Sequence, residues 1–96
     1  MNLRIKEEDL ELIGIDSGGN EILHYQGGPF TGIMYKNADN ESLAYEVEFQ
    51  NGYREGRVKY YHSNGQLQEE YQLHDNIVVD GTFKSYDEEG NLIESF

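Results

Sequence analysis

The chain has 96 residues, of which 19 are acidic and 7 are basic, so its formal net charge is −12. This charge argues against nucleic acid and anionic membranes as direct ligands, and the lack of cysteine excludes a disulfide framework and thiolate metal sites. A chain of this length suits one domain, 1–96, with a core of modest size.

The amino-terminal segment, 1–21, predicts two short strands followed by a turn. Leu3 and Ile5 alternate with polar residues, and an acidic step and four aliphatic residues come next. A helix over 6–13 is the alternative, because several of its residues tolerate a helix. The composition of 16–20 is typical of a turn. Since this segment lacks the apolar run of a signal peptide, and no stretch is long enough to span a membrane, we expect a cytoplasmic protein.

Residues 45–73 predict three strands joined by two turns. Apolar and polar side chains alternate on both sides of Asn51 and Gly52, which is the pattern of half-buried strands. Asn64 and Gly65 lie between the second and third strands. Because both residue types tolerate positive φ, this pair predicts a two-residue type I′ turn.

The expected register keeps charged side chains on one face of these strands and apolar side chains on the other. It consists of five cross-strand pairs: Phe49 with Val58, Glu48 with Lys59, Glu46 with Tyr61, Val58 with Tyr71, and Lys59 with Glu70. Opposite charges across strands contribute only about 0.2–1 kcal/mol per pair, so burial of the apolar face contributes more. Because a single sheet would leave that face in water, we expect 1–15 to pack across or pair onto the first end of the sheet.

Glycines at Gly32, Gly56 and Gly81 recur at nearly equal intervals, and each is followed at the same distances by an apolar residue and a leucine. An internal repeat of this length indicates stacked units of supersecondary structure. We therefore divide the rest of the chain into three repeats: 22–44, 45–68 and 69–96.

Three stretches of this repeated region are similar to a known family. They are GGPFTG (27–32), NGYREGRVKYYHSNGQLQEE (51–70) and HDNIVVDGTFKSYDEEGNLIES (74–95). These stretches resemble the variant MORN repeats (membrane occupation and recognition nexus). With its GGPFTG opening, the chain looks most like small bacterial proteins described as antitoxins or immunity proteins. Glu41 stands where Gly65 and Gly90 stand, so the first repeat is expected to be the least regular.

The alternation and the resemblance together predict an all-β fold. We expect a twisted antiparallel meander of MORN-like β-hairpin repeats, with the amino-terminal strands covering one end. Ile93 and Phe96 lie on the last strand, whose free edge a second chain could use. The free protein is therefore expected to be a monomer or a weak homodimer.

The sequence predicts no catalytic residue, cofactor site or metal site. The three histidines, His24, His62 and His74, lack the spacing of metal ligands, and the clustered carboxylates match no calcium-binding loop. Two carboxylates are expected on the inner, apolar face, Glu69 opposite Tyr60 and Glu94 opposite Ser85.

The outer face is the expected site for a protein partner, because exposed tyrosines give contact area at low entropic cost. The register puts Glu46, Tyr61 and Gln68 in one row and Glu48, Lys59, Glu70 and Tyr86 in the next. We expect partner contacts at six residues: Glu46, Glu48, Tyr61, Glu70, Tyr86 and Glu88. Two alternatives are that these tyrosines only satisfy strand propensity, and that a partner docks along the concave side.

The resemblance implies an immunity protein, a non-catalytic inhibitor that binds a cognate bacterial toxin domain and blocks its active site. The negative charge favours a basic toxin that acts on nucleic acid, because an acidic protein can occupy a basic substrate groove. A MORN-repeat scaffold or lipid-associated module without a toxin partner is the second hypothesis, although an acidic surface argues against anionic lipid. An enzyme is the least favoured class.

Overall fold

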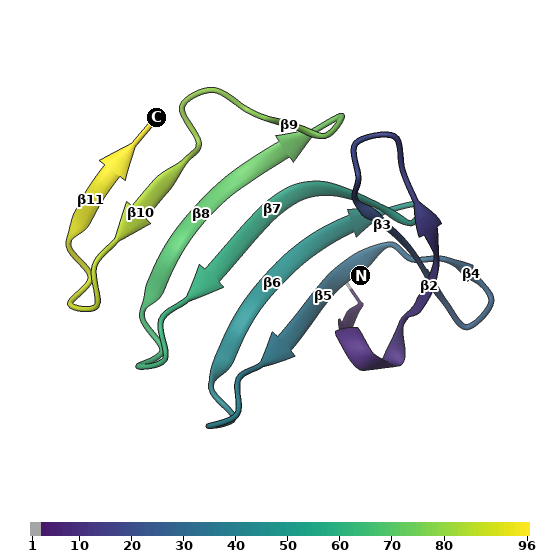
Figure 1. The fold of residues 1–96 in the computed structure, drawn as a ribbon, viewed down its shortest axis with the longest axis horizontal. Helices are drawn as coiled ribbons and strands as arrows, with labels where there is room; N and C mark the ends of the chain where they lie inside the picture. The colour runs from purple at the N-terminus through teal and green to yellow at the C-terminus, as the bar shows by residue number, and fades with distance from the viewer. Residues whose placement is uncertain (1–2) are drawn as a thin grey trace.

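The computed structural model describes residues 3–96 and consists almost entirely of β-strands (Figure 1). The large sheet contains, in spatial order, β1 (Arg4–Lys6), β5 (Gly32–Asn37), β6 (Leu43–Gln50), β7 (Tyr53–Tyr61), β8 (Leu67–His74), β10 (Lys84–Tyr86) and β11 (Leu92–Ser95), with β9 (Ile77–Val78) paired to β8. The small sheet contains β2 (Glu11–Ile15), β3 (Glu21–Tyr25) and β4 (Gly28–Pro29). The all-β prediction is confirmed.

The amino-terminal strands form as predicted, and one turn of 3-10 helix, Glu7–Asp9, joins them. The alternative of a helix over 6–13 is therefore wrong. β1 pairs with β5 in parallel, because the chain builds the small sheet before it returns as β5, and parallel neighbours need such a long connection. The expected pairing of the amino-terminal segment onto the first end of the sheet is therefore confirmed for β1, and the strands from β5 onward pair in antiparallel fashion. Residues 1 and 2 of the predicted strand lie outside the described residues.

The core lies on one face of the large sheet, which we call the inner face, against the small sheet. Six hydrophobic side chains are buried there: Leu23, Phe30, Met34, Val47, Phe49 and Val58. Leu23 comes from the small sheet, which lies over strands β5, β6 and β7 of the large sheet (Figure 1). The opposite face, which carries Glu46, Lys59 and Glu70, is the outer face.

Two kinds of turn close the hairpins at the two ends of the large sheet. The turn between β6 and β7 has both of its residues at positive φ, 53° at Asn51 and 92° at Gly52. The loop between β7 and β8 is different, because the amide of His62 donates to the carbonyl of Gln66 at 2.8 Å and so encloses three residues. Only Gly65 of these three has positive φ, at 89°. The predicted two-residue type I′ turn at Asn64 and Gly65 is therefore wrong, and the loop is a type I turn followed by a left-handed residue.

The predicted register between β6 and β7 is wrong by two positions. The two-residue turn sets Phe49 opposite Arg54, and a bulge then brings Val47 opposite Val58 and Glu46 opposite Lys59. The predicted pairs Phe49 with Val58, Glu48 with Lys59 and Glu46 with Tyr61 do not form. A slip of two positions leaves every side chain on its predicted face. The register between β7 and β8 is confirmed, including Val58 opposite Tyr71 and Lys59 opposite Glu70.

The three recurring glycines share a left-handed backbone. Their φ angles are 155° at Gly32, 101° at Gly56 and 81° at Gly81. A Cβ at Gly32 would lie 2.6 Å from the carbonyl oxygen of Leu3, and one at Gly56 would lie 3.1 Å from Cδ of Glu48. Each glycine comes shortly after a two-residue turn and the two cross-strand pairs next to that turn. The repeated sequence therefore corresponds to a repeated backbone conformation.

Candidate functional site

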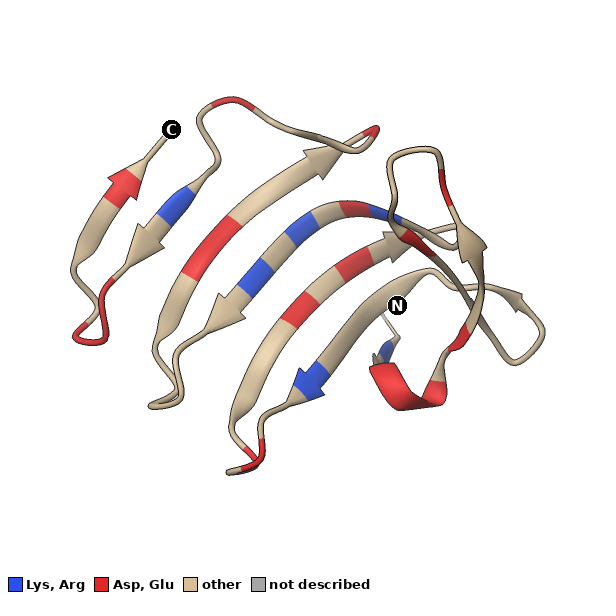
Figure 2. Cartoon of the chain, in the orientation of Figure 1, with Lys and Arg blue, Asp and Glu red and all other residues tan. Residues whose placement is uncertain are grey.

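The outer face carries alternating charges. Glu46 lies opposite Lys59, Lys59 opposite Glu70, and Glu70 opposite Lys84, so one row crosses four strands with a change of sign at each step. Figure 2 shows the corresponding red and blue bands from β6 to β10. The predicted rows are therefore wrong at β6, since Glu46 rather than Glu48 faces Lys59, whereas the predicted neighbours Lys59 and Glu70 are confirmed. This face is not a uniformly acidic surface.

Four of the six predicted contact residues form two equivalent pairs on this face. The hydroxyl of Tyr61 donates to Oε1 of Glu46 at 2.8 Å, and that of Tyr86 donates to Oε2 of Glu70 at 2.9 Å. Burial and the Glu46 hydrogen bond raise the pKa of Tyr61 to about 12. The bond to Glu70, followed by burial, raises the pKa of Tyr86. Both tyrosines are thus neutral donors that fix a neighbouring carboxylate.

The other two predicted residues have different surroundings. Oε1 of Glu48 accepts a hydrogen bond from the backbone amide of Arg57 at 3.0 Å, next to the bulge at Gly56. Glu48 therefore supports the backbone and is not a freely available charge. Glu88 lies in the loop between β10 and β11, apart from the other five, with an exposed side chain.

Acidic side chains instead gather along one end of the large sheet, in a surface that we call the acidic rim. It comprises the loops 38–42 and 87–91 and the 3-10 turn, none of which contains lysine or arginine. Its acidic residues are Glu7, Glu8, Asp9, Asp39, Glu41, Asp87, Glu88 and Glu89 (Figure 2). This surface was not predicted, because strand alternation sorts residues by sheet face and leaves the loops out. The concentration of acidic residues in predicted turns was the available signal.

Asparagine side chains connect the loops at this end of the sheet. Nδ2 of Asn40 donates to the carbonyl of Ser63 at 3.1 Å, and Nδ2 of Asn64 donates to the carbonyl of Glu88 at 2.7 Å. The two bonds occupy equivalent positions in successive hairpins. They hold the two acidic loops at defined places on either side of the loop between β7 and β8.

The inner face continues beyond the small sheet as a row of aromatic side chains. The ring centroids of Tyr71 and Phe83 are 6.1 Å apart, and those of Phe83 and Phe96 are 5.4 Å apart. The neighbouring row contains the predicted inner carboxylates, with Glu69 opposite Tyr60 and Glu94 opposite Ser85, as expected. This half of the inner face is open to solvent, and Phe96 is 69% exposed.

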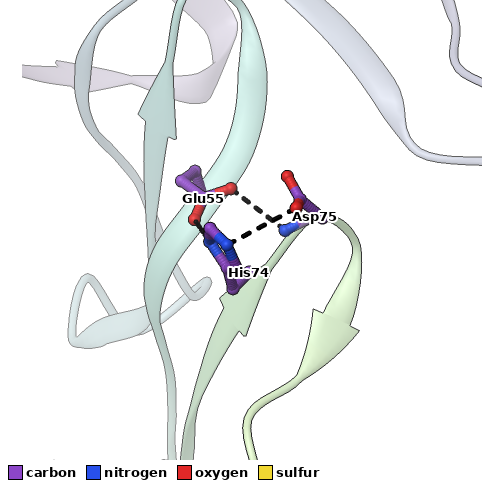
Figure 3. Close-up of polar contacts among 3 residues, drawn as sticks. All are labelled: Glu55, His74 and Asp75. Atoms are coloured by element: carbon purple, nitrogen blue, oxygen red, sulfur yellow. Dashed lines mark hydrogen bonds and ion pairs between the residues drawn. The ribbon is translucent and has the colours of Figure 1, made fainter.

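Glu55, His74 and Asp75 form a separate polar cluster, where the bulge of β7 lies beside the turn between β8 and β9 (Figure 3). Nδ1 of His74 lies 2.8 Å from Oε2 of Glu55, and Nε2 lies 3.4 Å from Oδ2 of Asp75. The hydrogen bond to Glu55 and the charge of Asp75 raise the pKa of His74, and the same bond lowers the pKa of Glu55.

These three residues offer donor atoms of the kinds that a transition-metal ion accepts. However, both ring nitrogens of His74 already face carboxylates, so a cation would have to compete with the bound proton. The site is better described as an imidazole between two carboxylates that favour its protonated form. Sequence spacing did not reveal it, because its members come from two different strands and a turn.

Two stretches of the chain, 54–75 and 79–95, match the MORN repeat variant family. They cover less than half of the chain, and they fall in the region from β7 to β11. No curated protein and no solved structure matches the chain. Among residues 3–96 there is no helix of the length and apolar character needed to cross a membrane.

Proposed function

We propose that this protein is a non-catalytic binding protein that captures and neutralises a basic bacterial toxin domain in the cytoplasm of the producing cell. The observation that carries the proposal is the acidic rim, which holds eight of the 19 acidic residues at one end of a MORN-type sheet. Its loops contain no lysine or arginine, and Lys36 pairs with one of the eight, Glu7, at 3.7 Å. MORN repeats are modules of a protein-interaction type, which favours binding over catalysis.

Charge also favours a particular class of toxin. An enzyme that cleaves or modifies nucleic acid needs a positively charged substrate groove. An acidic protein is attracted to such a groove over several ångströms, and it blocks the active site once it is bound. The outer face contributes less to this attraction, because its carboxylates are matched by Arg4, Lys59 and Lys84.

The second candidate function is a scaffold module without a toxin partner. The match to a repeat family supports it, because one fold serves many functions and the match identifies architecture more firmly than activity. Direct binding of anionic lipid is disfavoured, since the net charge of −12 would be repelled by such a surface.

The test is a binding and protection experiment with the toxin domain encoded beside the gene for this protein. We expect a tight complex by calorimetry, an association rate that falls as salt rises, and survival of cells that express both proteins. If the purified proteins do not associate and co-expression gives no protection, the toxin proposal is wrong for that pair. The scaffold function then becomes the better explanation.

A further inference from the structure

We propose that the uncovered half of the inner face is the docking surface for a cationic, extended segment of the protein partner. This inference rests on the proposed function for the basic character of the partner. We call this surface the aromatic–acidic face, and its residues are Tyr60, Glu69, Tyr71, Phe83, Glu94 and Phe96.

The aromatic–acidic face continues a row of core residues without a break. The row crosses the sheet from Val47 to Val58 and then to Tyr71, by direct cross-strand pairing. Exposure rises along the same row from 1% at Val58 to 69% at Phe96, because the small sheet covers only the first half. Aromatic rings stacked on a rigid sheet but open to water are typical of protein-binding sites.

The second row gives this face its chemical character. Glu69, Ser85 and Glu94 lie side by side across β8, β10 and β11. Within residues 3–96, neither Glu69 nor Glu94 forms an ion pair. The lysines of the same strands, Lys59 and Lys84, belong to the outer face. Arg54 lies opposite Phe49, at the covered end of the inner face. Burial and the neighbouring Tyr60 raise the pKa of Tyr71, and the positive charge of Arg54 partly opposes this shift.

An aromatic row beside a carboxylate row fits lysine and arginine side chains. Their aliphatic stems can pack on the rings while their charged ends reach the carboxylates, and a cation over an aromatic ring is itself favourable. Neighbouring strands are about 4.8 Å apart, so the aromatic row from β8 to β11 offers about 10 Å, enough for three or four residues of an extended chain. A second copy of this protein is a poorer occupant, because it would bring its own charge of −12.

The test uses the full chain and two short peptides, one alternating arginine with leucine and a matched one with glutamate in place of arginine. We expect amide chemical-shift changes on addition of the arginine peptide, gathered at residues 69–71, 83–85 and 94–96. The glutamate peptide should cause none. The matched variants are Glu69→Gln and Glu70→Gln, because these neighbours on β8 lie on opposite faces of the sheet.

We expect Glu69→Gln with Glu94→Gln to weaken peptide binding about fivefold, in line with the loss of exposed charge pairs. Glu70→Gln should change binding less than twofold. Phe96→Ala should also weaken binding, and because the Phe96 side chain is exposed and outside the core, this change tests the aromatic row without disturbing the core.

Shift changes on the outer face or the acidic rim would overturn this inference, and so would the absence of binding by the arginine peptide. Concentration-dependent line broadening at these same residues without peptide would replace the cationic segment with a second copy of the chain. A toxin complex that leaves this face unperturbed contradicts only the docking surface. Peptide binding here without any toxin complex contradicts only the toxin function.

Discussion

Glu41 occupies in the loop between β5 and β6 the left-handed position that Gly65 occupies in the loop between β7 and β8. Their φ angles are 66° and 89°, and each amide donates to the carbonyl of the first residue of its loop. A side chain in this conformation costs about 1–2 kcal/mol, whereas glycine adopts it without steric cost. The first repeat therefore keeps the loop geometry of its neighbours although its sequence departs from theirs, and the glutamate makes that geometry energetically costly.

Replacing Glu41 with glycine should therefore stabilise the protein by about 1 kcal/mol, because it removes the strain and costs only part of that in unfolded-state entropy. Urea denaturation of Glu41→Gly measures the gain. Gly65→Ala is the matched reversal and should lose a similar amount. A loss of stability in both variants would contradict the equivalence of the two loops.

Substitution of Glu48, which was expected to contact a partner, should lower the stability of the fold. Because its carboxylate accepts the Arg57 amide beside the bulge, Glu48→Lys should lower the free energy of unfolding by about 1 kcal/mol. Glu48→Gln retains an acceptor oxygen and should cost less. Glu88→Lys, at an exposed loop position, should change stability by no more than about 0.5 kcal/mol. Equal stability of all three variants would show that the bulge does not need this acceptor.

The period-two pattern was sufficient to predict the strands and the two faces. Val47, Val58 and Tyr71 lie on the inner face as expected, although the pairing of β6 with β7 was wrong. A slip of two positions keeps the alternation intact, so hydrophobic pattern alone cannot reveal it. The turn at Asn51 and Gly52 carries the missing information, because a two-residue turn fixes the pairs beside it and forces the extra residues into a bulge.

Contacts that depend on distant strands could not be predicted from local pattern. Glu55 contacts His74 only because the bulge of β7 lies beside the last residue of β8, and the sequence pattern did not predict this bulge. The parallel pairing of β1 with β5 likewise depends on how the small sheet packs. The alternating charge of the outer face follows from the true register, so the predicted contact set inherited the register error.

The Glu55, His74 and Asp75 group predicts a pH dependence of stability. The pKa of His74 is raised from 6.5, so its stabilising contribution is complete below that value and is lost as pH rises through the higher folded pKa. The pKa of Glu55 is lowered from 4.5, so its contribution is lost as pH falls through the still lower folded value. His74→Gln should therefore be most destabilising near about pH 5.5 and nearly neutral near about pH 9.

Chemical denaturation of the wild-type and variant proteins at these two pH values measures that difference. Glu55→Gln should reduce the same pH dependence, and the double variant should add little, because the two residues act through one hydrogen bond. A penalty for His74→Gln that does not vary with pH would mean that the imidazolium charge contributes nothing.

The acidic rim predicts which charges attract the proposed toxin partner. Glu88 and Asp80 are both exposed loop residues, but Glu88 lies on the rim and Asp80 lies before β10, at the other end of the large sheet. Each change to lysine alters the net charge equally, so a difference between them reports position. We expect Glu88→Lys to slow association with the toxin domain about twofold while changing dissociation little, because exposed rim charges act on the encounter. Asp80→Lys should have a smaller effect.

Stopped-flow association at low and high salt measures both rates. The difference between the two variants should shrink at high salt, since screening limits the reach of exposed charges to about 8 Å at physiological ionic strength. Circular dichroism confirms that each variant is folded. Equal association rates for the two positions at low salt would show that the net charge, rather than the acidic rim, attracts the partner.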